Sequence, residues 1–481
     1  MTDKKLIRIN KKELPEGWKV ERIENLSTVI LGQSPASSSY NTNEEGLPFF
    51  QGKTEFGPAY PQAVKWCTEP KKTALKNDVL ISVRAPVGPT NLAPAKCCIG
   101  RGLAAIRPND GVSYKYLLYY LRSIEAAVAS LGTGTTFKAI SGGILKNLPV
   151  LLAPEHEQKR IVAEIEKQFS RLDEAVENLK RVKANLKRYK ASVLKAAVEG
   201  KLTEDWRKAH PGAEPADKLL ERILAERRKK WEETELVKME AKGKEPKDDK
   251  WKKKYKELPQ VDGALLPALP DGWVWANLPQ LGELDRGKSK HRPRNAPFLY
   301  GGPYPFVQTG DVRHATGIIK QYSQTYSEEG LKQSRLWPKE TLCITIAANI
   351  ADTALLGFDA CFPDSIVGFI PENKNIDVRF IEYFVRTAKE DLERYAPATA
   401  QKNINLAILS DVAVSLPPEE EQHIIIDEIE RCLTIAEGIE FDIEQNMVRA
   451  NRLRQSILKK AFSGKLVAQD ENDEFLVSSL K

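Results

Sequence analysis

The chain has 481 residues, of which 41% are hydrophobic and 29% charged, so it is too long for one hydrophobic core and divides into two or three domains. No run approaches 18 apolar residues, which argues against a transmembrane helix, and the start, Met-Thr-Asp-Lys-Lys, lacks the apolar core of a secretion signal. Six sparse cysteines and five scattered histidines argue against a disulfide framework or a metal site and favour a reducing cytoplasm. The net charge of +7 permits a nucleic-acid partner without requiring one.

The first segment, residues 1–153, alternates short strand-like runs with Gly/Pro turns and then shows a helical pattern from Tyr114 to Ser130. This pattern predicts a mixed α/β domain. A helix follows over residues 154–200, beginning after Pro154 and ending at Gly200, as proline and glycine favour. About 40 residues at ~1.5 Å each give a rod of roughly 60 Å.

The apolar residues of this helix recur every seven positions, which predicts a coiled coil. The first column contains Ile165, Leu172, Leu179, Leu186 and Val193. The companion column contains Ile161, Ala175, Val182, Tyr189 and Ala196, with Gln168 as a polar exception.

Residues 201–268 form a charged insertion in which Leu219 to Lys238 fits an exposed helix. One interpretation is a solvated linker. The other is an auxiliary phosphate contact, because aromatic residues interleave with lysines from Trp251 to Lys256.

The remainder repeats the first part. A second domain is predicted over 269–416, a second long helix over 417–466 and a tail over 467–481. Leu269-Pro-Asp-Gly-Trp273 echoes Leu14-Pro-Glu-Gly-Trp18, and residues 148–202 match 412–466 at a constant offset of 264 with 18 identities in 55 positions. A repeat this long indicates a duplicated unit.

The second helix keeps the heptad register with Ile425, Ile429, Cys432, Ala436, Ile439, Ile443, Ala450, Leu453 and Ile457, although Asn446 and Lys460 fall in its seam. Each long helix is therefore the expected partner of the other.

The doubled Leu-Pro-x-Gly-Trp motif, the helix starts at Pro154-Glu-His-Glu-Gln158 and Pro418-Glu-Glu-Glu-Gln422, and the Gly-Lys-Leu helix ends resemble the DNA specificity (S) subunit of type I restriction–modification systems. The resemblance covers nearly the whole chain and is weakest at residues 203–260. It implies two target recognition domains separated by two antiparallel helices with pseudo-twofold symmetry. Such a molecule reads a two-part asymmetric site in double-stranded DNA across an unread spacer.

The resemblance also implies partners and cofactors. The helices dock two methyltransferase (M) subunits, and restriction (R) subunits join that core; no membrane is involved. This chain would bind no cofactor itself, while S-adenosylmethionine belongs to the M subunit and ATP with Mg to the R subunit. The residues expected in the coiled coil and M-subunit interface are Ile161, Ile165, Leu172, Leu179, Leu186, Val193, Ile425, Ile429, Ile443, Leu453 and Ile457.

Reading DNA requires side chains at base edges and cations at phosphates. Basic, hydroxyl and amide residues in the predicted loops are the candidates. In the first domain they are Lys53, Arg84, Arg101, Thr135, Thr136 and Lys138. In the second domain they are Lys288, Lys290, Arg292, Arg294, Arg313, Asn349, Gln401, Lys402 and Asn403. Lys138 and Lys402 hold the same place in both copies; capping the preceding helix is their alternative role.

The motifs do not support catalysis. The Pro417-Pro418 pair is followed by Glu419 and opens a helix, so it is not an amino-methyltransferase motif, and no Walker loop is present. Gly100-Arg-Gly-Leu-Ala-Ala105 precedes strand-like residues, so it is read as a turn and not as a dinucleotide fingerprint.

Two other functional classes stay open. A coiled-coil adaptor that binds proteins predicts no salt-dependent DNA binding, and a stand-alone nuclease or methylase predicts DNA modification without a partner.

Overall fold

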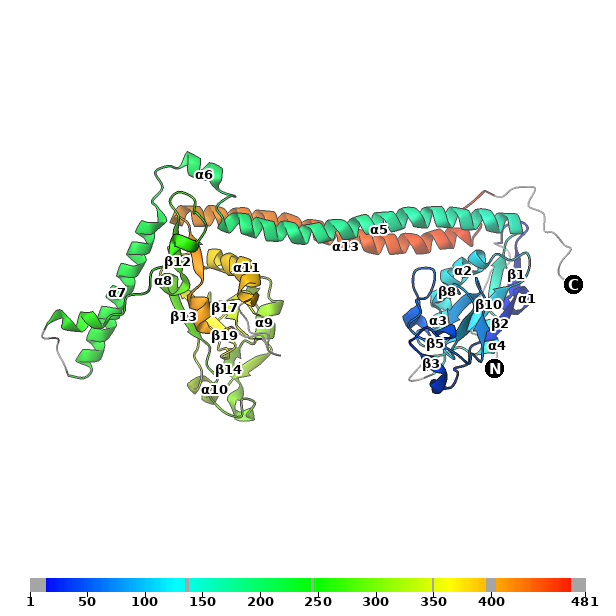
Figure 1. Ribbon diagram of the computed structural model, residues 1–481, viewed down its shortest axis with the longest axis horizontal. Coiled ribbons are helices and arrows are strands. Elements are labelled where there is room, and N and C mark those ends of the chain that lie inside the picture. Colours follow the sequence, from blue (N-terminus) through cyan, green and yellow to red (C-terminus); the bar gives the residue numbers. More distant parts are fainter. Residues whose placement is uncertain are drawn as a thin grey trace. The chain divides into compact units, whose positions relative to one another are not determined.

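The computed structural model describes residues 14–134, 138–243, 246, 248–347, 350–394 and 404–468. The chain forms two compact units, Met1–Val182 with Asp442–Lys481, and Lys183–Phe441. Each unit contains one globular domain together with part of α5 (Glu155–Val198) and part of α13 (Glu419–Ala461) (Figure 1). Among the described helices, none combines the length and apolar character needed to cross a bilayer.

In the first unit, the chain enters and leaves the domain side by side. Strand β1 (Lys19–Arg22) pairs antiparallel with β11 (Pro149–Leu152), which runs directly into α5. The main sheet is antiparallel with the order β2-β10-β7-β8, and a smaller sheet has the order β3-β5-β4-β9-β6. The strands of the main sheet are β2 (Ser27–Leu31), β7 (Val79–Ser82), β8 (Thr90–Leu92) and β10 (Leu103–Pro108). Those of the smaller sheet are β3 (Tyr40–Asn41), β4 (Leu47–Phe50), β5 (Trp66–Cys67), β6 (Thr73–Ala74) and β9 (Cys97–Ile99). The helices are α1 (Ile23–Leu26), α2 (Tyr114–Ser123), α3 (Glu125–Ser130) and α4 (Gly142–Lys146).

The core of this unit joins the domain to both long helices. Ile161 and Ile165 of α5 share one apolar cluster with Ile457 and Leu458 of α13. Phe462, just after α13, lies edge-on to two tyrosines of α2 with ring centroids 5.2 Å apart. The start of α5 therefore packs beside the end of α13, so the two helices are antiparallel.

The second unit repeats this topology. Strand β12 (Val274–Asn277) pairs with β20 (Ala413–Leu416), as β1 does with β11. The main sheet has the order β13-β19-β17-β18, matching β2-β10-β7-β8, and adds β15 at its edge. Its strands are β13 (Gly282–Arg286), β15 (Ile318–Ile319), β17 (Leu342–Thr345), β18 (Thr353–Leu356) and β19 (Ile366–Pro371), and a separate hairpin joins β14 (Tyr300–Phe306) to β16 (Gln324–Tyr326). The helices are α8 (Leu278–Leu281), α9 (Thr309–His314), α10 (Glu328–Lys332), α11 (Val378–Arg394) and α12 (Leu406–Ser410). The predicted duplication is confirmed in the order of the strands.

The insertion contains the predicted helix but is not a solvated linker. Helix α7 (Ala216–Glu240) covers the expected Leu219–Lys238 span, and α6 (Glu204–Ala209) precedes it. Ala216, Leu219 and Ile223 are buried in the core of the second unit. The Arg227 guanidinium donates to the Gly282 carbonyl at 3.1 Å. The linker interpretation is wrong for this half of the insertion, because its spaced apolar residues dock the helix on the domain.

The coiled coil confirms one predicted column and corrects the other. The column through Ile165, Leu172, Leu179, Leu186 and Val193 is buried or half-buried. In α5 the companion column lies one residue later than predicted from position 169 onward and includes Phe169, Val176, Lys190 and Ala197. In α13 the predicted Cys432 is buried as expected, and the column also includes Leu433, Glu440, Met447, Arg454 and Ala461.

Several predicted companions are therefore exposed. Val182 and Tyr189 are each 43% exposed, Ile439 is 39% exposed and Leu453 is 43% exposed. Asn446 and Lys460, the apparent polar exceptions, are exposed for the same reason. Charged residues can occupy the companion column because they form ion pairs there. The Lys190 ammonium lies 2.7 Å from the Glu440 carboxylate.

Candidate nucleic-acid interface

Three of the four cations predicted in the first domain, Lys53, Arg84 and Arg101, meet at one edge of its main sheet. Arg84 follows β7 by two residues and Arg101 precedes β10 by two residues. Because β7 and β10 are antiparallel, with Ser82 opposite Leu103, the end of one strand and the start of the other lie together. Lys53 begins a short 3-10 helix after β4 and reaches the same edge.

These side chains line a pocket of about 320 Å³. Its lining residues are Ser34, Gln51, Gly52, Lys53, Ser82, Arg84, Ala85, Arg101 and Gly102. Lys53, Arg84 and Arg101 are all exposed, and within the described part of the chain none of them forms an ion pair. The nearby Glu55 carboxylate accepts the Gly52 backbone N–H at 3.0 Å. The pocket thus presents unneutralised positive charge beside amide and hydroxyl groups.

Backbone contacts hold the rim of this pocket. The Ser82 hydroxyl donates to the Arg84 carbonyl at 2.9 Å, and the Arg101 N–H donates to the Ser34 hydroxyl at 3.3 Å. A Cβ atom at Gly102 would lie 2.1 Å from the Gln51 carbonyl oxygen, so only glycine lets these two loops approach so closely. The cations are therefore carried by fixed loops.

Lys138 lies on a segment beside this pocket. The Ile140 N–H donates to the Val83 carbonyl at 3.0 Å, and Ala139 bridges to Arg84 in antiparallel fashion. Lys138 itself is exposed. Thr135 and Thr136 lie outside the described residues.

The second domain does not gather its predicted cations in the same way. Lys288 lies 3.5 Å from Asp285, and Arg294 lies 2.7 Å from Asp364. The Arg292 guanidinium donates to three carbonyls of its own loop, at 2.7, 3.3 and 2.8 Å. Lys290 is exposed, and Arg313 is exposed on α9. Asn349, Gln401, Lys402 and Asn403 lie outside the described residues.

Equivalent positions at the sheet edge carry different charges in the two domains. Ala347 follows β17 by two residues, where the first domain has Arg84, and Asp364 precedes β19 by two, where it has Arg101. Gln308 corresponds to Gln51, because Pro305-Phe-Val-Gln308 repeats Pro48-Phe-Phe-Gln51. One scaffold thus presents a cationic edge in one domain and an edge with a paired carboxylate in the other.

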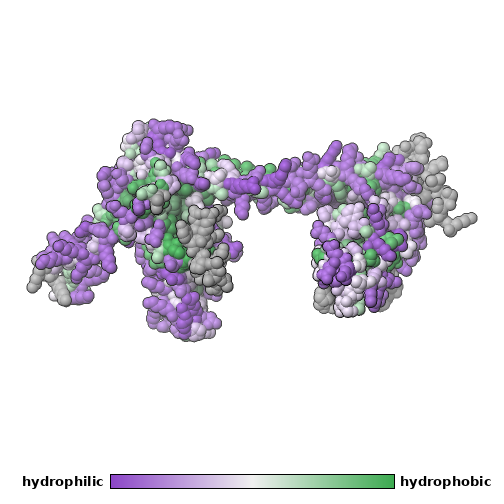
Figure 2. All heavy atoms as spheres, viewed as in Figure 1, coloured by the Kyte–Doolittle hydropathy of each residue, from purple (hydrophilic) through white to green (hydrophobic). Residues whose placement is uncertain are grey.

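The tip of the insertion carries aromatic residues and lysines together. Trp231 stacks on Trp251 at 6.1 Å and meets Tyr255 edge-on at 5.3 Å. The interleaved aromatics therefore pack among themselves. Lys253, Lys254 and Lys256 are exposed, and none of them pairs with a described carboxylate. The visible face of α7 is mostly hydrophilic (Figure 2).

The long helices keep apolar residues outside their seam. Ile435, Phe441 and Val448 of α13 are 50%, 61% and 46% exposed, respectively. These three residues lie outside the predicted heptad columns.

Two copies of one α/β scaffold, each attached to a pair of long helices, define a protein with a duplicated domain whose two copies carry different charges at the same sheet edge. Residues 15–188 and 270–445 match the family model described as the type I restriction modification DNA specificity domain, and the chain belongs to this family. It is the DNA-recognition subunit of a type I restriction–modification system.

Relatives match most of the chain. The putative type I restriction enzyme MjaX specificity subunit of Methanocaldococcus jannaschii is 42% identical over 193 residues, covering 40% of this chain and 44% of the relative. The EcoDI specificity subunit of Escherichia coli is 24% identical over 464 residues, covering 95% and 90%.

Solved structures show the same fold. The HsdS subunit from Thermoanaerobacter tengcongensis matches with a TM-score of 0.54 at 17% identity, covering 94% of this chain and 98% of that chain. A chain from a study of the assembly and conformational transition of the type I R-M system matches with a TM-score of 0.62 at 17% identity, covering 94% and 99%. The prediction of two α/β recognition domains joined by antiparallel helices is confirmed.

Proposed function

We propose that this chain contributes recognition but no catalysis to its complex, and that the pocket formed by Lys53, Arg84 and Arg101 contacts one half of a two-part DNA site. The unpaired cations at a fixed sheet edge carry this proposal. Guanidinium groups donate to guanine O6 and N7 in the major groove or to phosphate oxygens. The second domain reads the other half with a different set of side chains, since its corresponding edge holds Asp364.

We propose the partners and cofactors that the resemblance to the family implies. Two M subunits dock on the pair formed by α5 and α13, and exposed apolar residues such as Phe441 would be buried in that contact. R subunits add to this core. S-adenosylmethionine is held by the M subunit, and ATP with Mg by the R subunit.

A genome-wide methylation map tests the proposal. A clean host would express this chain with its neighbouring methyltransferase gene, and each gene alone as control. We expect a two-part asymmetric methylated motif only with both genes. Methylation by this chain alone would reveal an overlooked active site. A stable complex without new methylation would favour the adaptor function.

The length of the helix pair sets the spacer in this proposal. Inserting four residues between Leu179 and Leu186 is expected to lengthen the preferred spacer or to disrupt the heptad register, because a rigid pair of helices fixes the separation of two readers. Methylated-motif mapping of the variant complex measures this. An active variant with an unchanged spacer would contradict the ruler role.

The insertion tip is expected to add a phosphate contact. Replacing Lys253, Lys254 and Lys256 by glutamine should lower the slope of log K against log salt by up to about 3, without changing the methylated motif, because each phosphate contact contributes ~0.9 to that slope. Titrations of the complex on duplexes that extend beyond the site measure it.

The matched control removes three lysines that already pair with carboxylates. Lys208, Lys218 and Lys332 lie 2.8, 2.9 and 2.6 Å from their partners. Their glutamine variants should leave the slope unchanged. If the tip variant behaves like this control, the tip lysines are merely solvated.

A further inference from the structure

The start of each long helix carries a buried glutamine that binds the backbone of its domain. The Gln158 carbonyl accepts the Ser113 N–H at 2.9 Å, and its amide donates to the carbonyls of Ala153 and Gly111 at 2.9 and 3.2 Å. Gln158 is only 1% exposed. These contacts fasten the loop in front of α2 to the first turn of α5.

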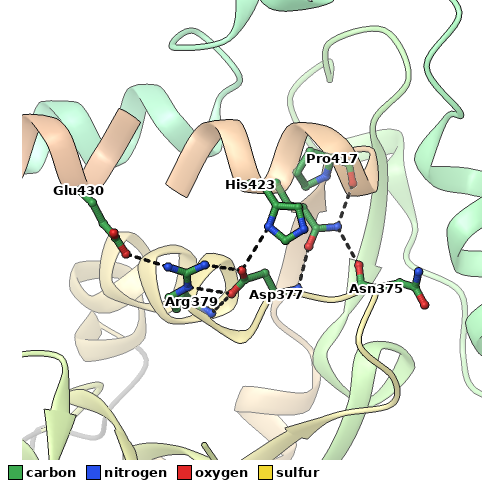
Figure 3. A network of polar contacts seen from close by, with 7 residues as sticks. Asn375, Asp377, Arg379, Pro417, His423 and Glu430 are labelled. Carbon is green, nitrogen blue, oxygen red and sulfur yellow. Dashed lines mark hydrogen bonds and ion pairs between the residues drawn. The ribbon is translucent and has the colours of Figure 1, made fainter. Parts of the chain in front are cut away.

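The second copy makes the same three bonds. The Gln422 carbonyl accepts the Asp377 N–H at 3.0 Å, and its amide donates to the carbonyls of Pro417 and Asn375 at 3.3 and 3.4 Å (Figure 3). Each partner lies 264 residues after its counterpart, the offset of the helix repeat. The duplicated motif therefore preserves a set of contacts as well as a helix start.

A buried glutamate beside each glutamine binds the domain's entry segment. The Trp18 indole N–H donates to the Glu157 carboxylate at 2.9 Å, and the Trp273 indole N–H donates to the Glu421 carboxylate at 2.8 Å. Both carboxylates are at most 1% exposed. The Leu-Pro-x-Gly-Trp and Pro-Glu-x-Glu-Gln motifs, far apart in the sequence, are thus the two sides of one junction.

An outer ion pair completes each junction. The Lys115 ammonium of α2 lies 2.7 Å from Glu166 of α5, and the Arg379 guanidinium of α11 lies 3.1 Å from Glu430 of α13. In the second copy, Asp377 also accepts from Arg379 at 2.9 Å and lies 3.5 Å from the His423 ring (Figure 3). Each domain is therefore held to the first turns of its helix by three kinds of contact, made by the glutamine, the glutamate and the ion pair.

We propose that these junctions hold each recognition domain at one angle to its helix, and that Gln158 and Gln422 are positioning residues for reading the spacer between the half-sites. Attachment alone needs only apolar burial, which tolerates small rotations. Directional hydrogen bonds from a buried polar pair select one geometry, at some cost in stability. This inference rests on the proposed two-part readout.

The magnitude of a tilt shows why the angle matters. A domain of about 140 residues is roughly 35 Å across. A tilt of about 5° at the junction would move its far edge by ~3 Å, close to the ~3.4 Å step between base pairs. If the junction is loosened, a recognition domain could therefore bind a half-site that is shifted by one base pair.

The test compares Gln158→Met and Gln422→Met with the wild type in the assembled complex with M subunits. Methylation is measured on duplexes whose half-sites are separated by the native spacer and by one base pair more or fewer. We expect the preference for the native spacer to fall about tenfold in either variant, while base preference within each half-site stays unchanged. An unchanged spacer preference in a folded, DNA-binding variant would overturn the proposal.

Matched variants separate positioning from general damage. Gln168→Met lies on the same helix, where the amide donates within α5 to Glu164 at 2.8 Å, and should leave spacer preference unchanged. Lys115→Met removes only the outer pair of the first junction, whereas Arg379→Met also removes the contact with Asp377. Each should lower the preference two- to threefold. These variants keep the test decisive if a buried methionine prevents folding.

A distance measurement separates this inference from the proposed function. Spin labels at Lys76→Cys on the first domain and Ser170→Cys on α5, both exposed positions within one unit, report the junction angle without DNA or M subunits. The distance distribution should broaden in Gln158→Met and not in Gln168→Met. Equal widths would overturn the junction role even if two-part methylation is observed. Broadening without any two-part methylation would sink the proposed function while leaving the junction as a positioning device.

Discussion

A complex in which Arg84 and Arg101 are both replaced by methionine is expected to bind its target duplex about 100-fold more weakly than the wild type. Each guanidinium that loses a base-edge contact costs about 1–3 kcal/mol, so two together give roughly two orders of magnitude. Methionine keeps the apolar stem of arginine and removes its charge, and both positions are exposed, so the domain should still fold. Equilibrium binding at several salt concentrations measures the effect.

The salt dependence tells base contacts from phosphate contacts. If both arginines bind phosphates, the slope of log K against log salt should fall by about 2 and the loss should be similar for all sequences. If they read bases, the slope should change little and discrimination should vanish at positions within one half-site. In both cases the half read by the second domain should remain specific. Loss of specificity in both halves would contradict independent reading by the two domains.

The control removes two cations from the opposite end of the same sheet. Lys76 precedes β7, and Lys96 follows β8, which runs antiparallel to β7. Both are exposed, and neither forms an ion pair with a described residue. The Lys76→Met/Lys96→Met variant should bind within about twofold of the wild type. Equal losses in the two variants would show that only net charge matters.

The pocket could be predicted in the first domain because its cations follow or precede strands directly. Arg84 and Arg101 flank two strand-like runs, and antiparallel pairing brings their ends together. Gln51, which also lines the pocket, could have been predicted as well, because the repeat places Gln308 at the matching position. In the second domain, the same reasoning named Lys288 and Arg294 without their partners. Lys288 pairs with Asp285, only three residues away, whereas Asp364 is 70 residues from Arg294. Only folding brings the second pair together, so the sequence did not reveal it.

The coiled coil shows a second limit. The column through Leu172 and Leu186 was predictable because apolar residues fill it continuously. The companion column was read from Val182 and Tyr189, since pattern recognition favours apolar residues over charged ones. The folded helix instead turns Lys190 inward, where Glu440 neutralises it. Residues next to each other differ by ~100° on a helix, so an error of one position exchanges a seam residue for an exposed one.

Glu382→Leu is expected to stabilise the second domain by about 3 kcal/mol above pH 7. Glu382 lies on α11, is only 4% exposed, and accepts one long hydrogen bond, 3.5 Å, from Thr353. Burial raises the pKa of its carboxyl from the ordinary 4.5 to about 7, although the nearby Arg386 lowers it. Leu118 occupies the matching place in the first domain, 264 residues earlier, and is buried there, so the scaffold accepts leucine at this position.

The direction of the pH dependence follows from the raised pKa. Below about pH 4.5 the carboxyl is protonated in both the folded and the unfolded chain, so folding buries no charge and the stability does not suffer from it. As the pH rises towards 7, the unfolded chain releases its proton while the folded domain retains it, so the wild type loses stability relative to the variant. Above pH 7 the full difference is present, because each unit of pKa shift corresponds to ~1.4 kcal/mol. The advantage of the variant should therefore be small at pH 4.5 and reach its plateau above pH 7.

Hydrogen exchange of peptides from α11 and β17, followed in denaturant at several pH values, isolates the stability of this domain from the rest of the chain. Glu329→Leu serves as control, because Glu329 is exposed on α10 and pairs with Lys332 at 2.6 Å; its removal should change stability by well under 1 kcal/mol. A gain in Glu382→Leu that is equal at pH 5 and pH 8 would mean that better packing, and not relief of a buried carboxyl, stabilises the variant. A loss at pH 8 would mean that the attraction of the nearby Arg386 and the hydrogen bond from Thr353 outweigh the cost of burying the Glu382 carboxylate. The second domain would then keep this carboxylate, absent from the first, as a charged contact between α11 and β18.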